Sequence, residues 1–169
     1  YAEAYNNLGN TLKELDKLNE AEASYRQAIL LKPDYAEAHF NLGITLQELG
    51  RFDGAEESYT LTIASKPDYA EAHYNLGVTL KELGKLNQAE ASYRQAIALK
   101  PDFAEAFNNL GITLHEMRRF DEAEASYRQA ISFKPGYAEA HSNLGNTLQE
   151  LGIFNEAEAS YRQAIVLKP

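Results

Sequence analysis

The stretch AEAHYNLGVTLKELGKLNQAEASYRQAIALKP, residues 70–101, decides the fold, because nearly the same text recurs before and after it. Its tripeptide Asn75-Leu76-Gly77 has four counterparts elsewhere in the chain, and consecutive copies lie 34 residues apart. A period of this size is typical of solenoids, in which each repeat is one supersecondary unit stacked on its neighbours. The sequence therefore predicts one array of about five blocks. They cover residues 2–35, 36–69, 70–103, 104–137 and 138–169.

Each block predicts two helices. In the third block, Leu76 and Leu80 fall on one side of a helix, which favours a first helix over residues 70–83. A second helix is predicted over residues 88–100, because Pro101 cannot continue it. Each block is therefore expected to be a helical hairpin.

The ends of these helices carry their own signals. We expect Gly84 to close the first helix in the left-handed conformation, and Asp16 and Arg118 to adopt the same strained backbone in the first and fourth blocks. Asp68 and Asn87 each precede a glutamate by three residues, so we predict that their side chains cap the two helix starts.

The second block departs most from the repeated text. Gly54 stands in the first turn of its second helix, Thr60 removes the arginine of the other blocks, and Thr62 replaces an alanine. Because glycine and β-branched residues are weaker helix formers, we expect this second helix to be the least stable of the array.

Several residues recur in every block: an Ala-Glu-Ala start, Asn-Leu-Gly, a leucine, an Ala-Glu pair, a tyrosine and a closing proline. This pattern resembles the tetratricopeptide repeat family, and the likeness covers every block. The resemblance implies an all-α, right-handed superhelical solenoid of about five helix-turn-helix units, whose first helices line a concave groove. The asparagine before Leu-Gly is also similar to that in the repeat arm of protein O-linked N-acetylglucosamine transferases.

Composition excludes several classes of function. With 25 acidic against 16 basic residues the net charge is −9, which argues against nucleic-acid binding and favours a neutral or basic partner. No cysteine is present for disulfides or thiolate metal sites, and no apolar run is long enough for a membrane span. We expect a soluble protein, with the cytoplasm favoured, and an excised piece of a longer array, because Tyr1 fills the last place of a missing block.

One asparagine per block would form a row along the groove floor. The row is Asn7, Asn41, Asn75, Asn109 and Asn143. Packed helices lie about 8 to 10 Å apart and an extended peptide advances about 3.3 Å per residue, so one amide could meet the peptide backbone at about every third residue. An amide side chain both donates and accepts hydrogen bonds, so it can bind the main chain of a peptide whatever the peptide's side chains are. The alternative is that these asparagines bond to a neighbouring helix or to water and only fix the stacking.

The groove residues around this row are apolar in the middle of the chain and bordered by acids. The apolar candidates are Phe40, Tyr74, Ile44, Val78 and Ile112, and the acidic candidates are Glu48, Glu82 and Glu116. They suggest a partner with apolar side chains and basic groups. Alternatively, Phe40 and Tyr74 pack over a neighbouring block.

Catalysis has little support in the sequence. His39, His73 and His141 recur at a packing position without carboxylate or cysteine companions, and His115 is expected to be exposed. The repeated serines have no base within reach of the pattern. We therefore predict no enzyme, no metal site and no cofactor.

Three functions follow from these observations. The first is a scaffold that binds a protein or peptide, holds an extended segment in the concave groove, and is part of a larger protein. The second is head-to-tail self-association through the last helix, with Tyr161, Ile165 and Leu167 exposed, which would be either a biological assembly or a consequence of cutting a longer array. The third, implied by the narrower resemblance, is the substrate-recruiting arm of a glycosyltransferase.

Overall fold

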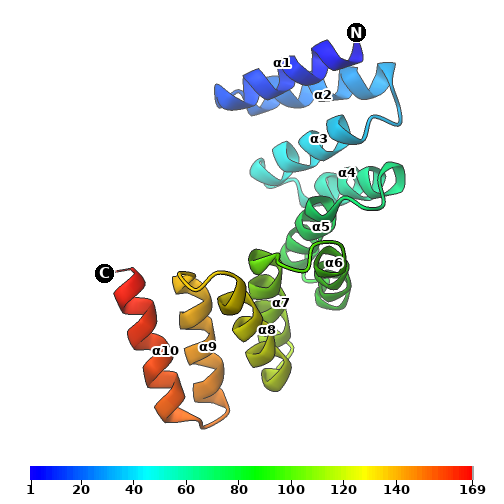
Figure 1. Ribbon diagram of the computed structural model, residues 1–169. Helices are drawn as coiled ribbons and strands as arrows, with labels where there is room; N and C mark the ends of the chain where they lie inside the picture. The colour runs from blue at the N-terminus through cyan, green and yellow to red at the C-terminus, as the bar shows by residue number, and fades with distance from the viewer. Residues whose placement is uncertain (169) are drawn as a thin grey trace. The chain divides into compact units, whose positions relative to one another are not determined.

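The computed structural model describes residues 1–168, which form ten α-helices and no strand (Figure 1). The helices follow one another in five consecutive pairs, one pair for each predicted block. They are α1 (Ala2–Glu14), α2 (Leu18–Leu31), α3 (Ala36–Glu48), α4 (Phe52–Ser65), α5 (Ala70–Glu82), α6 (Leu86–Leu99), α7 (Ala104–Glu116), α8 (Phe120–Phe133), α9 (Ala138–Glu150) and α10 (Phe154–Leu167). The prediction of an all-helical array of about five hairpins is confirmed.

The helices divide into two compact units. Unit 1 is Tyr1–Lys85 and holds α1 to α5, and unit 2 is Leu86–Pro169 and holds α6 to α10. Within each unit, every helix packs on the next one in the chain. The first helices of neighbouring hairpins also touch, α1 with α3 and α3 with α5 in unit 1, and α7 with α9 in unit 2. We call the exposed side of these helices the first-helix face of each unit.

The turn inside each hairpin has the predicted left-handed residue. Gly84 has φ +72°, and the N–H of Lys85 donates to the carbonyl of Leu80 at 2.8 Å, which satisfies a carbonyl that the helix end would leave free. Asp16 and Arg118 adopt φ 59° and 60° at the same place, as expected for non-glycine residues forced by the turn.

The predicted capping side chains are wrong. The residue that caps α5 is Tyr69, and its side chain makes no cap hydrogen bond. The second helix of the third block begins two residues earlier than predicted, so that Asn87 already lies inside α6 rather than before it. The helix begins soon after the left-handed turn residue, so the polar residue lies within the first helical turn and not at the N-cap position.

A tyrosine that is buried in the first, second and fourth blocks holds the two helices of its hairpin together. An added Cβ at Gly9 would lie 2.5 Å from the ring of Tyr25, and at Gly111 it would lie 2.6 Å from Tyr127. Only glycine leaves room for the ring at this distance. The tyrosines then join leucines and alanines of the next hairpin. In unit 1 this cluster contains Ala21, Tyr25, Leu42, Leu46, Ala55 and Tyr59.

Candidate functional site

The asparagine row lies on the first-helix face, where two of its members link neighbouring hairpins. Nδ2 of Asn41 on α3 donates to Oδ1 of both Asn6 and Asn10 on α1, each at 3.1 Å. In unit 2, Nδ2 of Asn143 on α9 donates to Oδ1 of Asn108 on α7 at 3.1 Å. These bonds correspond to the alternative that the sequence left open, in which the asparagines bond to a neighbouring helix and fix the stacking. The Oδ1 atom of each amide is still an acceptor that a ligand could use.

Unit 1 has a hollow of about 350 Å³ on this face. Three predicted site residues, Ile44, Glu48 and Asn75, line it, together with Gln47 and Tyr59. They come from three helices, α3, α4 and α5, so the hollow exists only once two hairpins have packed.

Unit 2 has the equivalent hollow, of about 160 Å³. Ile112, Glu116 and Asn143 line it, and each lies 68 residues after its counterpart in unit 1. Tyr127 repeats the position of Tyr59, and His115 that of Gln47. The same kinds of side chain therefore meet in both units: an aliphatic group, a carboxylate, a tyrosine and an amide.

Each hollow reaches a buried tyrosine that was not among the predicted site residues. The hydroxyl of Tyr59 donates to Oε1 of Gln47 at 3.0 Å. Burial, and then the nearby carboxylate of Glu48, raise the pKa of Tyr59 well above its ordinary value. Burial and Glu116 act in the same way on the pKa of Tyr127. Both tyrosines therefore stay neutral at physiological pH.

The carboxylate in unit 1 is not isolated. Nζ of Lys13 on α1 lies 3.1 Å from Oε1 of Glu48, and both groups remain accessible to solvent. An exposed pair of this kind stabilises the fold by at most about 1 kcal/mol, so Lys13 can give way to a cation of a ligand.

The prediction that His115 is exposed is wrong. Its side chain is half-buried beside the second hollow, and its Nε2 atom has no hydrogen-bond partner within residues 1–168. Its ring lies edge-on to Phe120 of the next helix, with centroids 5.1 Å apart. The burial comes from α8, which is why the pattern of α7 alone did not reveal it.

Other predicted site residues lie outside the two hollows. Phe40 packs against Tyr69 at the start of the next hairpin, with ring centroids 4.6 Å apart, which is the packing alternative. The others that line neither hollow are Asn7, Asn41, Tyr74, Val78, Glu82 and Asn109.

The histidines and serines of the repeat have structural contacts. Nε2 of His39 lies 2.8 Å from the carbonyl of Pro33, and His73 and His141 make the same contact to the preceding proline, which confirms a packing role. The hydroxyl of Ser126 donates to the carbonyl of Glu122, four residues earlier. No group of three metal-ligating side chains occurs within the described residues.

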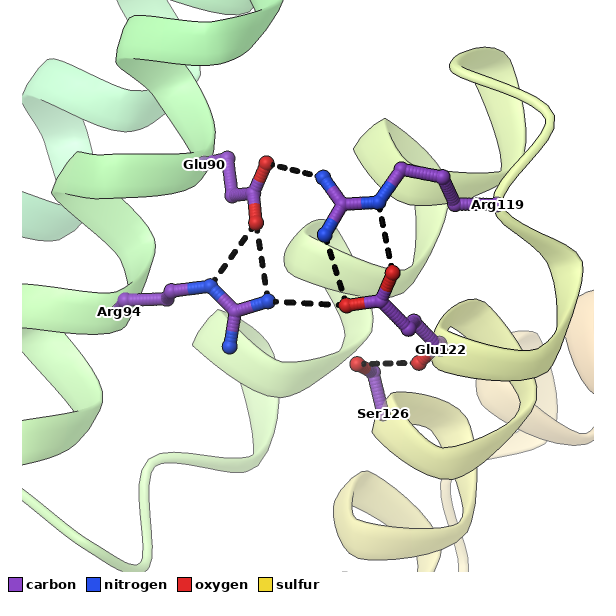
Figure 2. Close-up of polar contacts among 5 residues, drawn as sticks. All are labelled: Glu90, Arg94, Arg119, Glu122 and Ser126. Atoms are coloured by element: carbon purple, nitrogen blue, oxygen red, sulfur yellow. Dashed lines mark hydrogen bonds and ion pairs between the residues drawn. The ribbon is translucent and has the colours of Figure 1, made fainter.

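Along α6 and at the start of α8 in unit 2, four charged side chains form a closed network (Figure 2). Glu90 on α6 accepts from Arg94 of its own helix at 2.9 Å and from Arg119 at 2.5 Å, and Glu122 on α8 accepts from Arg119 at 2.7 Å. Arg94 closes the ring with a longer contact to Glu122 of 3.4 Å. Burial alone would raise the pKa of Glu90, but the hydrogen bonds from Arg119 and Arg94 bring it below its ordinary value.

Family models match along the chain. The model described as TPR repeat matches residues 9–50, 79–118 and 119–152. Models described as tetratricopeptide repeat match residues 36–69, 58–91, 103–134 and 138–169. A search among curated protein sequences found no match. Among residues 1–168, no helix combines the length and the apolar character needed to cross a membrane.

Solved structures share this fold. A crystal structure of MamA is 26% identical, with a TM-score of 0.91 over 95% of this chain and 94% of its own. YrrB, described as a TPR protein with an unusual peptide-binding site, is 24% identical, with a TM-score of 0.84 over 98% of this chain and 85% of its own. PilF of Pseudomonas aeruginosa is 21% identical, with a TM-score of 0.88 over 99% of this chain and 77% of its own. Since the family models match well over half of the residues, the chain belongs to the tetratricopeptide repeat family.

Proposed function

We propose that this protein is a binding scaffold that holds an extended peptide segment of a partner protein on the first-helix face. The observation that carries the proposal is the recurrence of the same hollow in both units, with Ile44, Glu48 and Asn75 in one and their counterparts in the other. A peptide side chain would enter each hollow, while the asparagines hold the main chain.

The asparagine amides support main-chain binding through their oxygen atoms. The two N–H groups of Asn41 are engaged with α1, so its Oδ1 is the atom offered to a peptide N–H. One N–H of Asn143 donates to Asn108, so its second N–H is available to a ligand in addition to its Oδ1. Because the bonds to the neighbouring helix fix the orientation of these amides, little side-chain entropy is lost when a peptide binds.

The hollows favour an aliphatic side chain close to a basic one. Ile44 and Ile112 supply apolar surface, and Glu48 and Glu116 supply negative charge at the same place. The overall charge of −9 attracts basic segments and repels acidic ones. YrrB, which shares the fold, is described as having a peptide-binding site.

The test is a selection of random dodecapeptides displayed on phage, followed by affinity measurements with the enriched peptides. Substituting Ile44→Lys and Ile112→Lys together places two cations in the hollows and removes their apolar wall. We expect the affinity to fall by at least about tenfold.

A matched control is Gln27→Lys, which adds a cation on an exposed position of α2 outside both hollows. It should leave the affinity unchanged, and circular dichroism should show the same helicity for all three proteins. Enriched peptides that bind the double lysine variant as tightly as the parent chain would refute the proposal.

A second candidate function is head-to-tail association of the chain. Leu8 on α1 is 47% exposed, whereas its counterpart Leu42 is only 4% exposed because the preceding hairpin covers it. Ile165 on α10 is 66% exposed, whereas its counterpart Ile29 is half-buried under the next hairpin. The end of one copy therefore matches the beginning of another, through the same contact that joins hairpins within a unit.

Two of the three predicted self-association residues, Tyr161 and Leu167, are half-buried, and Ile165 is the exposed one. Light scattering over a range of concentrations tests the association of the chain. Ile165→Lys should keep it monomeric, while Val166→Lys should not, because the counterpart Leu30 stays exposed inside the array. A parent chain that is monomeric at every concentration would exclude this function.

A further inference from the structure

The second helices of unit 1 border a furrow of about 320 Å³ between α2 and α4, away from the asparagine row. Leu30 and Leu61 form its rim and are 73% and 42% exposed, and Leu46 lies beneath them. Leucines exposed on both sides of a hollow leave contiguous apolar surface in water, and such patches mark interaction sites. The furrow therefore offers an apolar surface that the fold itself does not need.

The same furrow occurs twice in unit 2, with different chemistry. Between α6 and α8 it is about 240 Å³, and between α8 and α10 about 480 Å³, so size does not distinguish the three. In both, an Arg–Glu pair crosses the furrow: Arg94 with Glu122, and Arg128 with Glu156 at 2.8 Å. Figure 2 shows the first of these pairs as part of the charged network.

In unit 1 this crossing pair is missing. Gly54 stands where unit 2 has Glu122 and Glu156. Arg26 pairs with Glu22 of its own helix, as Arg94 and Arg128 do with their own glutamates, but within residues 1–168 it makes no pair across the furrow. Leu61 stands where unit 2 has Gln129 and Gln163. Both changes make the furrow of unit 1 more apolar than its equivalents.

The same helix also carries an unbalanced charge. Glu57 lines the furrow where unit 2 has Ala125 and Ala159. Within the described residues, the Glu57 carboxylate makes no hydrogen bond or ion pair. The arginine that could balance it three residues later is replaced by Thr60.

Three of these departures of α4 meet at one place, and the glycine among them weakens the helix. Glycine and threonine lower helix propensity, and an exposed leucine gains nothing from the fold. In a chain whose blocks are otherwise so alike, three unusual residues of α4 and one of α2 converge on a single hollow.

We propose that the furrow between α2 and α4 is a second binding site, which takes one large apolar side chain of a partner protein with a lysine or arginine beside it. The apolar side chain would fill the space between Leu30, Leu46 and Leu61, and the basic group would pair with Glu57 at the rim. The site lies apart from the asparagine row, so it is independent of peptide binding on the first-helix face.

The experiment uses a furrow-closed variant of the full chain, Gly54→Glu, Glu57→Ala and Leu61→Gln, which gives α4 the residues that α8 carries at the same positions. Random dodecapeptides displayed on phage are selected on the parent chain, with removal of clones that also bind the variant. We expect the survivors to share a large apolar residue next to a lysine or arginine. Their affinity should be lower for the furrow-closed variant by at least about tenfold.

Two further variants separate this result from misfolding and from the first-helix face. The reciprocal exchange Ala98→Leu, Glu122→Gly, Ala125→Glu, Arg128→Thr and Gln129→Leu in unit 2 should create a second copy of the site and double the number of peptides bound. The Ile44→Lys and Ile112→Lys variant should bind the selected peptides as the parent does. No surviving clone, survivors without the apolar and basic pair, or loss of binding in the Ile44 and Ile112 variant would each overturn the proposal.

Discussion

The junction between α2 and α4 in unit 1 and the junction between α6 and α8 in unit 2 have the same backbone design but different charge chemistry. In unit 1, Glu22 accepts from Arg26 and from Arg51, which lies 2.6 Å away. In unit 2, Glu90 accepts from the equivalent arginines, and Glu122 joins them into a ring of four (Figure 2). One residue, glycine or glutamate at the same place of the second helix, decides whether the junction is closed by charge or left open as an apolar furrow.

The largest loss of stability should come from a substitution that has the same effect in both units. Gly43→Ala in unit 1 and Gly111→Ala in unit 2 would place a Cβ 2.7 Å from Tyr59 and 2.6 Å from Tyr127. Such overpacking against a buried ring should lower the free energy of unfolding by about 2 kcal/mol in either unit. Urea unfolding of each variant measures the loss.

The control is Gly136→Ala, whose added Cβ has nothing within 4 Å, and which should change the free energy of unfolding by less than about 0.5 kcal/mol. If Gly43→Ala or Gly111→Ala behaved like this control, the tyrosine contact would not be what holds the hairpin together.

A smaller effect should separate the two junctions. Glu22→Gln leaves Arg26 and Arg51 side by side without a carboxylate, and should lower the free energy of unfolding by about 1 kcal/mol. Glu90→Gln should have a smaller effect, because Glu122 still bridges its two arginines. Urea unfolding of the two variants, with the exposed Glu57→Gln as control, gives the order, and a larger loss for Glu90→Gln would contradict it.

Lowering the pH should weaken the charged network between α6 and α8. The pKa of Glu122 is held below its ordinary value by a hydrogen bond from Arg119, and the pKa of Glu90 is also lowered. Because the unfolded chain binds these protons at a higher pH than the folded chain does, their stabilising effect is complete above the ordinary glutamate pKa of about 4.3 and is lost as the pH falls through the lowered values.

The measurement is the urea midpoint between neutral and acidic pH for the parent chain and for a variant with Glu90→Gln and Glu122→Gln. The variant should lose less stability on acidification than the parent. Equal losses in the two proteins would show that this network does not contribute to the pH dependence.

The smallest effect should come from closing the unit 1 junction. Gly54→Glu improves helix propensity and gives Arg26 a partner across the furrow, but its Cβ would lie 3.2 Å from Cδ1 of Leu46, which must shift slightly. We expect a net gain of about 0.5 kcal/mol in the free energy of unfolding. Thermal unfolding measures it, Gly54→Ala separates the helix effect from the charge effect, and a gain as large with alanine would mean that the charge contributes nothing.

Sequence reasoning succeeded where the signal lies within one hairpin. The left-handed backbone at Asp16 and Arg118 was predicted because both occupy the place of a turn glycine. It failed where the second helix of the hairpin intervenes, since His115 is half-buried by α8. It left two alternatives open where a second hairpin intervenes, and the structure shows that Phe40 packs on Tyr69 of the next hairpin. The caps failed for a related reason, since the position of a helix start depends on the geometry of the turn before it.

The amino-acid sequence by itself determined the repeat, the helix pairs, the turns and the family, because these depend on contacts between residues close together in the chain. It also supplied three of the residues that line each hollow, but not their grouping. Only the tertiary structure decided that Asn41 bonds to α1, that a tyrosine closes each hollow, and that Gly54, Glu57 and Leu61 share a furrow with Leu30. These features are built from helices of neighbouring hairpins, and which side chains meet there depends on how the hairpins pack against each other.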